Sequence, residues 1–179
     1  MIKKNILITG SKNTGKSTLV QKILQQFSTS YAGFQTIPFE IFEAGPTYLM
    51  RDLITKKQMP ISKCVGKRII GIPITFSTFG KRCLQNSITS KHLFVVMDEL
   101  GRFERTSYDF IDMVNKVLSS EKIVIAVLKA ESIDYLSLIK DRPDCYLYNL
   151  DDSLFDEVYQ DIISKLNIIL QREEKNEKD

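Results

Sequence analysis

The chain of 179 residues has no tryptophan, one histidine and three cysteines. The cysteines, Cys64, Cys83 and Cys145, are odd in number, far apart and without C-x-x-C spacing. This pattern argues against a disulfide framework or a zinc site and predicts reduced thiols. The single histidine, His92, begins an apolar run, and we expect it to have a structural role.

Long apolar runs are also missing. No run approaches the 18 residues of a membrane span, and the chain enters an apolar stretch directly after Lys3 and Lys4, which predicts a cytoplasmic protein without a signal peptide. Hydrophobic residues make up 43% and charged residues 26%, a composition typical of globular proteins. The length suits one α/β domain with a sizeable core. The sequence carries no signal for an oligomeric state.

Acidic residues are scarce in the first half of the chain. Residues 1–91 hold 14 Lys and Arg against 3 Asp and Glu, a charge of +11, whereas residues 92–179 carry −8. A basic half favours a polyanionic ligand, although nucleic acid or a solvated face would suit it equally. The basic segment Arg51–Arg68 has little aromatic interleaving, so a platform for stacking single-stranded bases is not indicated.

The most specific motif is GSKNTGKST at residues 10–18, directly after an apolar run. It satisfies G-x-x-x-x-G-K-[ST], the pattern of a loop whose backbone amides surround a polyphosphate. The following stretch, Lys16–Phe27, has apolar residues spaced for one face of a helix, and a helix start adds its dipole and free amides. The predicted nucleotide-binding residues are Gly10, Ser11, Lys12, Asn13, Thr14, Gly15, Lys16, Ser17 and Thr18.

Within this loop, Lys16 is expected to reach the β- and γ-phosphates of a nucleoside triphosphate and Ser17 to bind Mg²⁺. A second candidate metal ligand is Asp98, at the end of the apolar run 92–97. There it could hold the magnesium ion from the side opposite Ser17. The next residue, Glu99, turns the other way in a strand and could orient a water molecule or accept its proton.

Apolar runs alternate with helical patterns along the chain. Strands are expected at 6–9, 33–42, 67–75, 92–97, 123–128 and 145–150, and helices at 16–27, 80–90, 107–118, 133–140 and from residue 152 or 153 onward. Segment 43–66 is interpreted as an irregular hairpin and loop. The alternation predicts a three-layer α/β/α fold with a mostly parallel sheet and an added β-hairpin region. We expect a single domain over residues 1–171 and a charged, frayed tail over 172–179.

The stretch Met97–Glu104, MDELGRFE, completes a second pattern, D-E-[IL]-G-[KR]-[MF]-E after an apolar strand. With the phosphate loop, it resembles the nucleoside-triphosphatase family that includes the cancer-related nucleoside-triphosphatase and its prokaryotic relatives. The resemblance implies a RecA-like P-loop fold and Mg²⁺-dependent hydrolysis of ATP, GTP and other triphosphates. It also implies that Glu104 is the final acid of the motif. The chain departs from the family at Asn13-Thr14 and at residues 148–153, where an Asn-Arg pair is missing.

An arginine near the γ-phosphate would stabilise charge in the transition state. We select Arg102 as the catalytic arginine, together with Lys16 and Glu99, and keep Arg105 and Arg142 as weaker candidates. Lys129, just after the run 123–128, lies where a nucleotide contact is expected.

Several functions use the same phosphate loop. Besides a triphosphatase, the residues suit a kinase for a nucleotide or other small molecule, with an acceptor pocket between segment 43–66 and the loop that carries Arg102. A GTP-dependent switch ranks third, because Asn115-Lys116-Val117-Leu118 lacks the final acid of N-K-x-D. A non-enzymatic interaction module is disfavoured by the complete set of Lys16, Ser17, Asp98 and Glu99.

Overall fold

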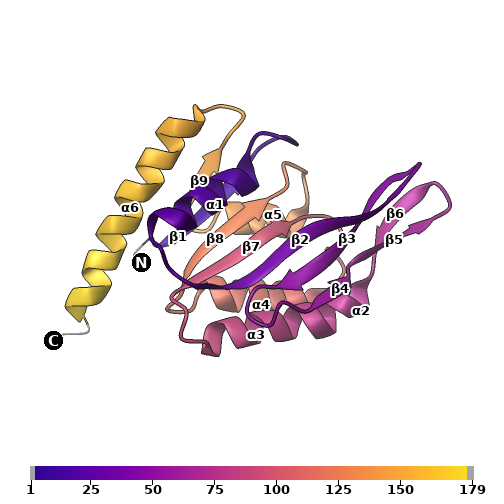
Figure 1. Ribbon diagram of the computed structural model, residues 1–179, viewed down its shortest axis with the longest axis horizontal. Coiled ribbons are helices and arrows are strands. Elements are labelled where there is room, and N and C mark those ends of the chain that lie inside the picture. The colour runs from indigo at the N-terminus through magenta and orange to yellow at the C-terminus, as the bar shows by residue number, and fades with distance from the viewer. Residues whose placement is uncertain (1–2, 177–179) are drawn as a thin grey trace.

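The computed structural model describes residues 3–176. Within them, the central sheet has seven strands in the order β4-β3-β2-β7-β8-β1-β9 (Figure 1). The five strands from β2 to β9 in this order are parallel, and β3 and β4 add an antiparallel edge. The strands are β1 (Asn5–Thr9), β2 (Tyr31–Phe42), β3 (Gly45–Asp52), β4 (Gln58–Pro60), β7 (Phe94–Leu100), β8 (Ile123–Leu128) and β9 (Cys145–Asn149).

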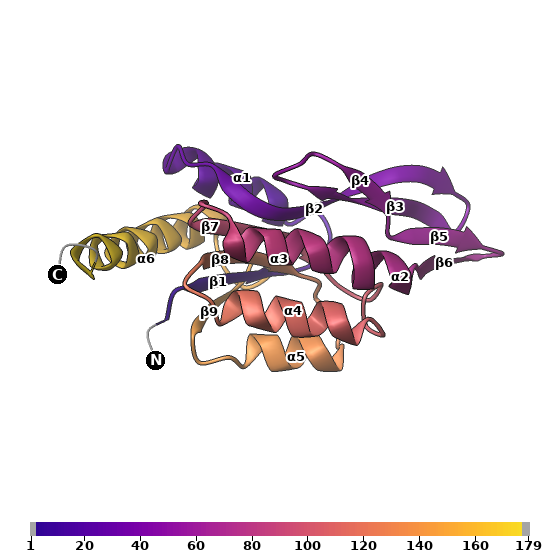
Figure 2. The ribbon, with the colours of Figure 1, turned by 90° about the horizontal axis from the view of Figure 1, so that it is seen from below.

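Helices cover both faces of this sheet (Figures 1 and 2). One face carries α1 (Lys16–Gln26) and α6 (Phe155–Asn176), and the other carries α3 (Lys81–Thr89), α4 (Tyr108–Leu118) and α5 (Asp134–Lys140). Side chains alternate between the two faces, so that Ile6 and Ile8 pack with α1 and α6 whereas Leu7 packs on the opposite side. The strand β8 is buried along its whole length, which explains its continuous apolar run. The predicted three-layer α/β/α fold is confirmed.

The expected hairpin region is more regular than the sequence indicated. Segment 43–66 contains β3, β4 and β5 (Ser62–Val65), and β5 pairs with β6 (Arg68–Gly71) in a separate two-stranded sheet. The interpretation of 43–66 as irregular was therefore wrong. β4, β5 and β6 are three or four residues long and mostly exposed, so they lack the apolar periodicity by which a strand is recognised.

The strand expected at 67–75 ends at Gly71, because Pro73 begins the helical turn α2 (Pro73–Thr75), which continues into the π-helical turn η1 (Phe76–Gly80). Proline has no amide hydrogen to give to a sheet and is favoured in the first turn of a helix. The tail expected at 172–179 lies within α6 as far as Asn176, and residues 177–179 lie outside the described part of the chain.

None of the helices within residues 3–176 combines the length and the apolar character that crossing a lipid bilayer requires.

Candidate functional site

The phosphate loop connects the carboxyl end of β1 to the start of α1. Gly15 caps the helix with a φ of 89°, a left-handed conformation that glycine adopts without steric cost. Asn13 also has a positive φ, of 66°, and asparagine is among the few other residues that tolerate it. The departure from the family pattern at Asn13 is therefore compatible with a tightly turned loop. The Thr14 hydroxyl donates to the Ser11 carbonyl at 3.0 Å and holds the turn together.

Lys16 is buried, and its ammonium lies inside the loop. Its Nζ donates to the carbonyl of Gly10 at 2.9 Å and to that of Ser11 at 2.6 Å. Beside it, the Ser17 hydroxyl donates to Oδ1 of Asp98 at 3.1 Å. The structure therefore brings together three of the predicted site residues, two from the start of α1 and one from β7.

Asp98 is buried, with 7% of its surface exposed. Its pKa is raised to about 6, chiefly by burial and in part by Glu99, against the lowering effects of the Ser17 hydrogen bond and of Lys16. A bound cation would offset the cost of burying this charge. The hydroxyl and the carboxylate are hard oxygen donors of the kind that Mg²⁺ prefers, so Ser17 and Asp98 fit a magnesium ion. Among the described residues no group of three His, Cys, Asp or Glu forms a separate metal cluster.

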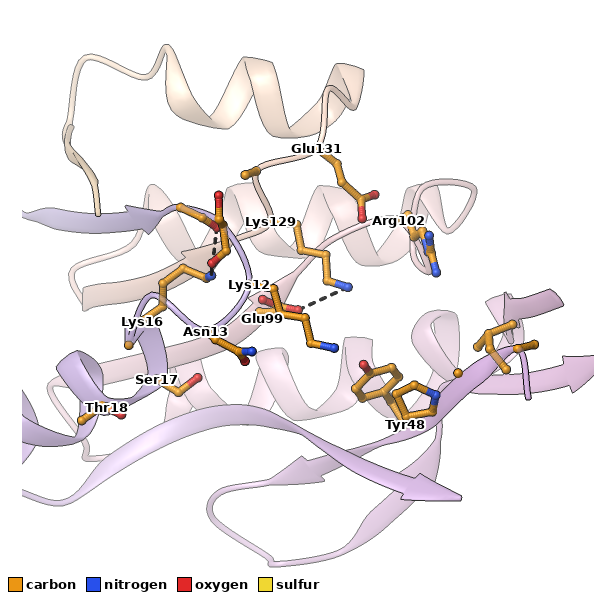
Figure 3. Close-up of a pocket in the computed structure, with 18 residues that line it drawn as sticks. Lys12, Asn13, Lys16, Ser17, Thr18, Tyr48, Glu99, Arg102, Lys129 and Glu131 are labelled. Carbon is orange, nitrogen blue, oxygen red and sulfur yellow. Dashed lines mark hydrogen bonds and ion pairs between the residues drawn. The ribbon is translucent and has the colours of Figure 1, made fainter. Parts of the chain in front are cut away.

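Glu99 lies in the wall of a cavity beside the phosphate loop. The pairing of β7 with β8 shifts register between Asp98 and Leu100, and the Glu99 amide donates to Oγ1 of Thr36 on β2 at 3.2 Å. The Glu99 carboxylate forms an ion pair with Lys129, with 3.4 Å between Oε1 and Nζ. Figure 3 shows both side chains pointing into the same space as Lys12.

The cavity measures about 640 Å³, within the usual range for small-molecule sites. Its walls are the phosphate loop, the turn between β2 and β3, Tyr48, Arg102 and the residues that follow β8. Arg102 and Tyr48 lie across the cavity from the loop (Figure 3). All predicted nucleotide-binding residues line it except Thr14, whose hydroxyl supports the loop from within.

The weaker arginine candidates lie elsewhere. Arg142 binds Asp144 at 2.7 Å and the Ser119 hydroxyl at 2.9 Å, at the amino end of β9 and therefore at the edge opposite the phosphate loop. Arg105 lines a neighbouring hollow. Lys129 does line the cavity, and its Nζ lies 5.9 and 5.7 Å from the ring centres of Tyr48 and Phe103.

Glu104 has a supporting position rather than a place in the cavity wall. It is 3% exposed, and its Oε1 accepts hydrogen bonds from the Gly101 amide at 2.5 Å and from the Tyr135 hydroxyl at 2.6 Å. Tyr135, on α5, also lies 2.7 Å from the Gly101 carbonyl. Burial raises the pKa of Glu104 to about 7. The pair therefore fixes the turn that presents Arg102 to the cavity.

Sequence reasoning missed three residues that hold the site in place. They are Thr36, which binds the Glu99 amide, Tyr135, and Asp151, whose carboxylate accepts from the Ser11 amide at 2.9 Å and from the Ser11 hydroxyl at 3.0 Å. Each acts on a residue more than 30 positions away in the chain, so no local pattern pointed to it.

Comparisons with known proteins find similarity over most of the chain. A family model described as NTPase matches residues 5–163. A protein named nucleoside-triphosphatase THEP1 from Thermotoga maritima is 30% identical over 170 residues, which cover 90% of this chain and 94% of that protein. The mouse protein named cancer-related nucleoside-triphosphatase homolog is 25% identical, with coverage of 90% and 95%. The crystal structure of THEP1 from Aquifex aeolicus matches with a TM-score of 0.70 at 23% identity, over 90% of this chain and 98% of that one, and so shares its fold.

Proposed function

Because this chain belongs to the NTPase family, we propose that it hydrolyses the γ-phosphate of ATP, GTP and other nucleoside triphosphates with the help of Mg²⁺. The observation that carries the proposal is the convergence of Lys16, the Ser17–Asp98 pair and Glu99 on one cavity at the carboxyl ends of parallel strands. Ligands of open α/β sheets bind at this edge.

Substrate binding rests on the phosphate loop. Its amides and the first turn of α1 surround the β- and γ-phosphates. The Lys16 ammonium, now held by two loop carbonyls, exchanges these for phosphate oxygens and neutralises the charge that develops on the leaving diphosphate. Ser17 and Asp98 would hold Mg²⁺, which supplies further positive charge to the phosphate oxygens when bound.

Hydrolysis needs an oriented water molecule. Glu99 is the residue that would accept its proton while the water oxygen bonds to the γ-phosphorus and the bond to the β-phosphate oxygen breaks. The products are a nucleoside diphosphate and inorganic phosphate. Lys129 orients the Glu99 carboxylate through their ion pair, and Arg102 would stabilise the charge on the transferring group.

The test is phosphate release from ATP, GTP, CTP and UTP with and without Mg²⁺. Lys16→Ala and Glu99→Gln are each expected to lower kcat by about 100-fold or more, and chelation of Mg²⁺ to abolish turnover. The charge-matched controls are Lys116→Ala and Glu121→Gln, at exposed positions outside the cavity, and they should retain wild-type rates.

Two results would contradict the proposal. If Glu99→Gln turns over at the wild-type rate, Glu99 does not accept the proton of the attacking water. Tight nucleotide binding without phosphate release, with transfer only to an added hydroxyl compound, would make the protein a kinase.

A further inference from the structure

A second hollow opens beside the nucleotide cavity. It measures about 510 Å³ and lies between the β5–β6 hairpin and the loop that follows β7. The two hollows share Ala44, Ile69 and Arg102 in their walls. A ligand in the second hollow would therefore touch the same arginine that faces the nucleotide.

Hydrogen bonds hold the chain segments that flank this hollow. The Ile72 amide donates to the Ile61 carbonyl at 2.9 Å, which joins the end of β6 to the residue before β5. The Ser107 hydroxyl donates to the Pro73 carbonyl at 3.3 Å, which joins the loop after β7 to the turn after β6. These bonds indicate a largely preformed site, as is usual for small-molecule pockets.

Its lining is strongly basic. Lys67, Arg68, Arg102 and Arg105 all line the hollow, and no Asp or Glu does. Within the described part of the chain, none of these four side chains has a hydrogen bond or an ion pair with a carboxylate, whereas Lys129 next to them is paired with Glu99. Four like charges around one concave surface repel one another and focus a positive potential that attracts an anion.

Three of the four cations are arginines, whose planar guanidinium matches a phosphate group with two parallel hydrogen bonds. Apart from Thr106, the rest of the lining is apolar or glycine and includes Ile70, Pro73 and Phe103. The Arg102 guanidinium lies 5.3 Å from the centre of the Phe103 ring, which offers a flat surface to a planar group. The lining thus combines contacts for a phosphate with contacts for an apolar or planar body.

We propose that the hollow lined by Arg68, Arg102 and Arg105 binds a second ligand, a phosphate monoester with an apolar or planar body, next to the bound nucleoside triphosphate. A nucleic-acid strand fits less well, because the hollow is small and carries one aromatic ring rather than a row of stacking surfaces. The proposal goes beyond hydrolysis, which requires only water as the second reactant.

Isothermal titration tests this directly. The full chain is first saturated with Mg²⁺ and a non-hydrolysable ATP analogue, so that the phosphate loop is occupied, and then titrated with AMP, GMP, CMP or UMP. At least one of these monophosphates is expected to bind with a Kd tighter than about 1 mM. The parent nucleoside, which lacks the phosphate, should bind far more weakly.

The variant Arg68→Ala/Arg105→Ala should weaken this binding by about tenfold or more, because each arginine contributes a charge-assisted contact. Lys57→Ala/Lys63→Ala removes the same charge at exposed positions outside both hollows and should leave it unchanged. If both double variants weaken monophosphate binding equally, the net charge of the protein explains the effect, and the proposal is overturned.

Absence of a titration signal with all four monophosphates would also overturn it, as would binding of a single-stranded RNA 12-mer in their place. The outcome is separable from that of the proposed function. Binding of the ATP analogue and phosphate release are measured independently of the second titration, so either can fail while the other holds.

Discussion

At the scale of single residues, Glu104 and Tyr135 form a buried pair with more acceptors than protons. The Tyr135 hydroxyl lies within hydrogen-bond distance of both the Gly101 carbonyl and the Glu104 carboxyl, but it has one hydrogen to donate. When Glu104 is protonated, its carboxyl can donate to the Tyr135 oxygen while the Tyr135 hydroxyl donates to the Gly101 carbonyl, so both contacts are hydrogen bonds. This agrees with the raised pKa of Glu104, about 7, which burial causes.

This pair predicts a pH-dependent stability. Because the pKa of Glu104 is higher in the folded chain than in the unfolded one, its contribution to stability is complete below about pH 4.5 and is lost as the pH rises through 7. Between pH 5 and 8, the wild type should lose more unfolding free energy than Glu104→Gln, by on the order of 3 kcal/mol. Urea unfolding at a series of pH values measures the difference.

Asp98 also has a raised pKa, but it titrates in both proteins and cancels in that comparison. Parallel pH profiles of the wild type and Glu104→Gln would show that Glu104 keeps an ordinary pKa.

The residues of the candidate site differ in how far the sequence predicted them. Lys16, Ser17, Asp98 and Glu99 belong to local motifs whose spacing reflects one loop and one strand end. The structure places Lys16, Ser17 and Glu99 in the wall of one cavity, and Asp98 accepts a hydrogen bond from the Ser17 hydroxyl. Asp151 is an ordinary acidic loop residue in the sequence, and only the parallel pairing of β9 with β1 brings it to Ser11. Such contacts depend on the fold and have no local pattern.

At the scale of elements, β2 and β7 approach each other closely. A Cβ atom added to Gly33 would lie 1.9 Å from the Val96 carbonyl oxygen, and Gly33 has a φ of +106°. The obstacle is backbone in the middle of a parallel pair, so it cannot move aside without breaking the ladder between the two strands.

Gly33→Ala is therefore expected to destabilise the protein by about 3 kcal/mol or more, the sum of backbone strain and overpacking. The matched control is Gly45→Ala, because Gly45 has a similar φ of +114° but no atom within 4 Å of an added Cβ. Chemical denaturation should show a much smaller loss for Gly45→Ala. If Gly33→Ala and Gly45→Ala lose similar free energies of unfolding, the positive φ alone explains the destabilisation and the contact with Val96 does not contribute.

The sequence predicted the strands that are buried in the folded protein and indicated the short exposed strands only poorly. β7 and β8 are covered on both faces, and this leaves a continuous apolar run in the sequence. β4, β5 and β6 are three or four residues long and mostly exposed. Their strand conformation comes from antiparallel partners rather than from their own side chains, so the sequence of 43–66 carries little trace of it.

At the scale of the whole molecule, the three thiols are free but unequally protected. Cys83 and Cys145 are buried, whereas Cys64 on β5 is partly exposed. Burial raises the pKa of Cys145 to about 11 and that of Cys83 further above its ordinary value. Because the thiolate is the reactive form, both buried cysteines are protected by the fold.

A thiol reagent such as DTNB should therefore label one cysteine quickly in the native protein and three after unfolding. Cys64→Ser should remove the fast phase and leave slow labelling at a rate set by opening of the fold. Fast labelling of two or three thiols in the native protein would mean that the layers over Cys83 or Cys145 open readily.

The position of β1 in the sheet bears on how the protein is made. β1 is synthesised before its neighbours, and Ile6 pairs with Ile125 of β8 and Tyr146 of β9. At about 5–20 residues per second, the ribosome needs roughly 6 to 25 seconds to pass from Ile6 to Ile125. For much of that time the phosphate loop is outside the ribosome with an apolar strand attached, while β8 and β9, the two strands that pair with β1, have not yet been made. A nascent chain of this fold therefore acquires its nucleotide site late in synthesis, and until then β1 is a natural target for chaperones.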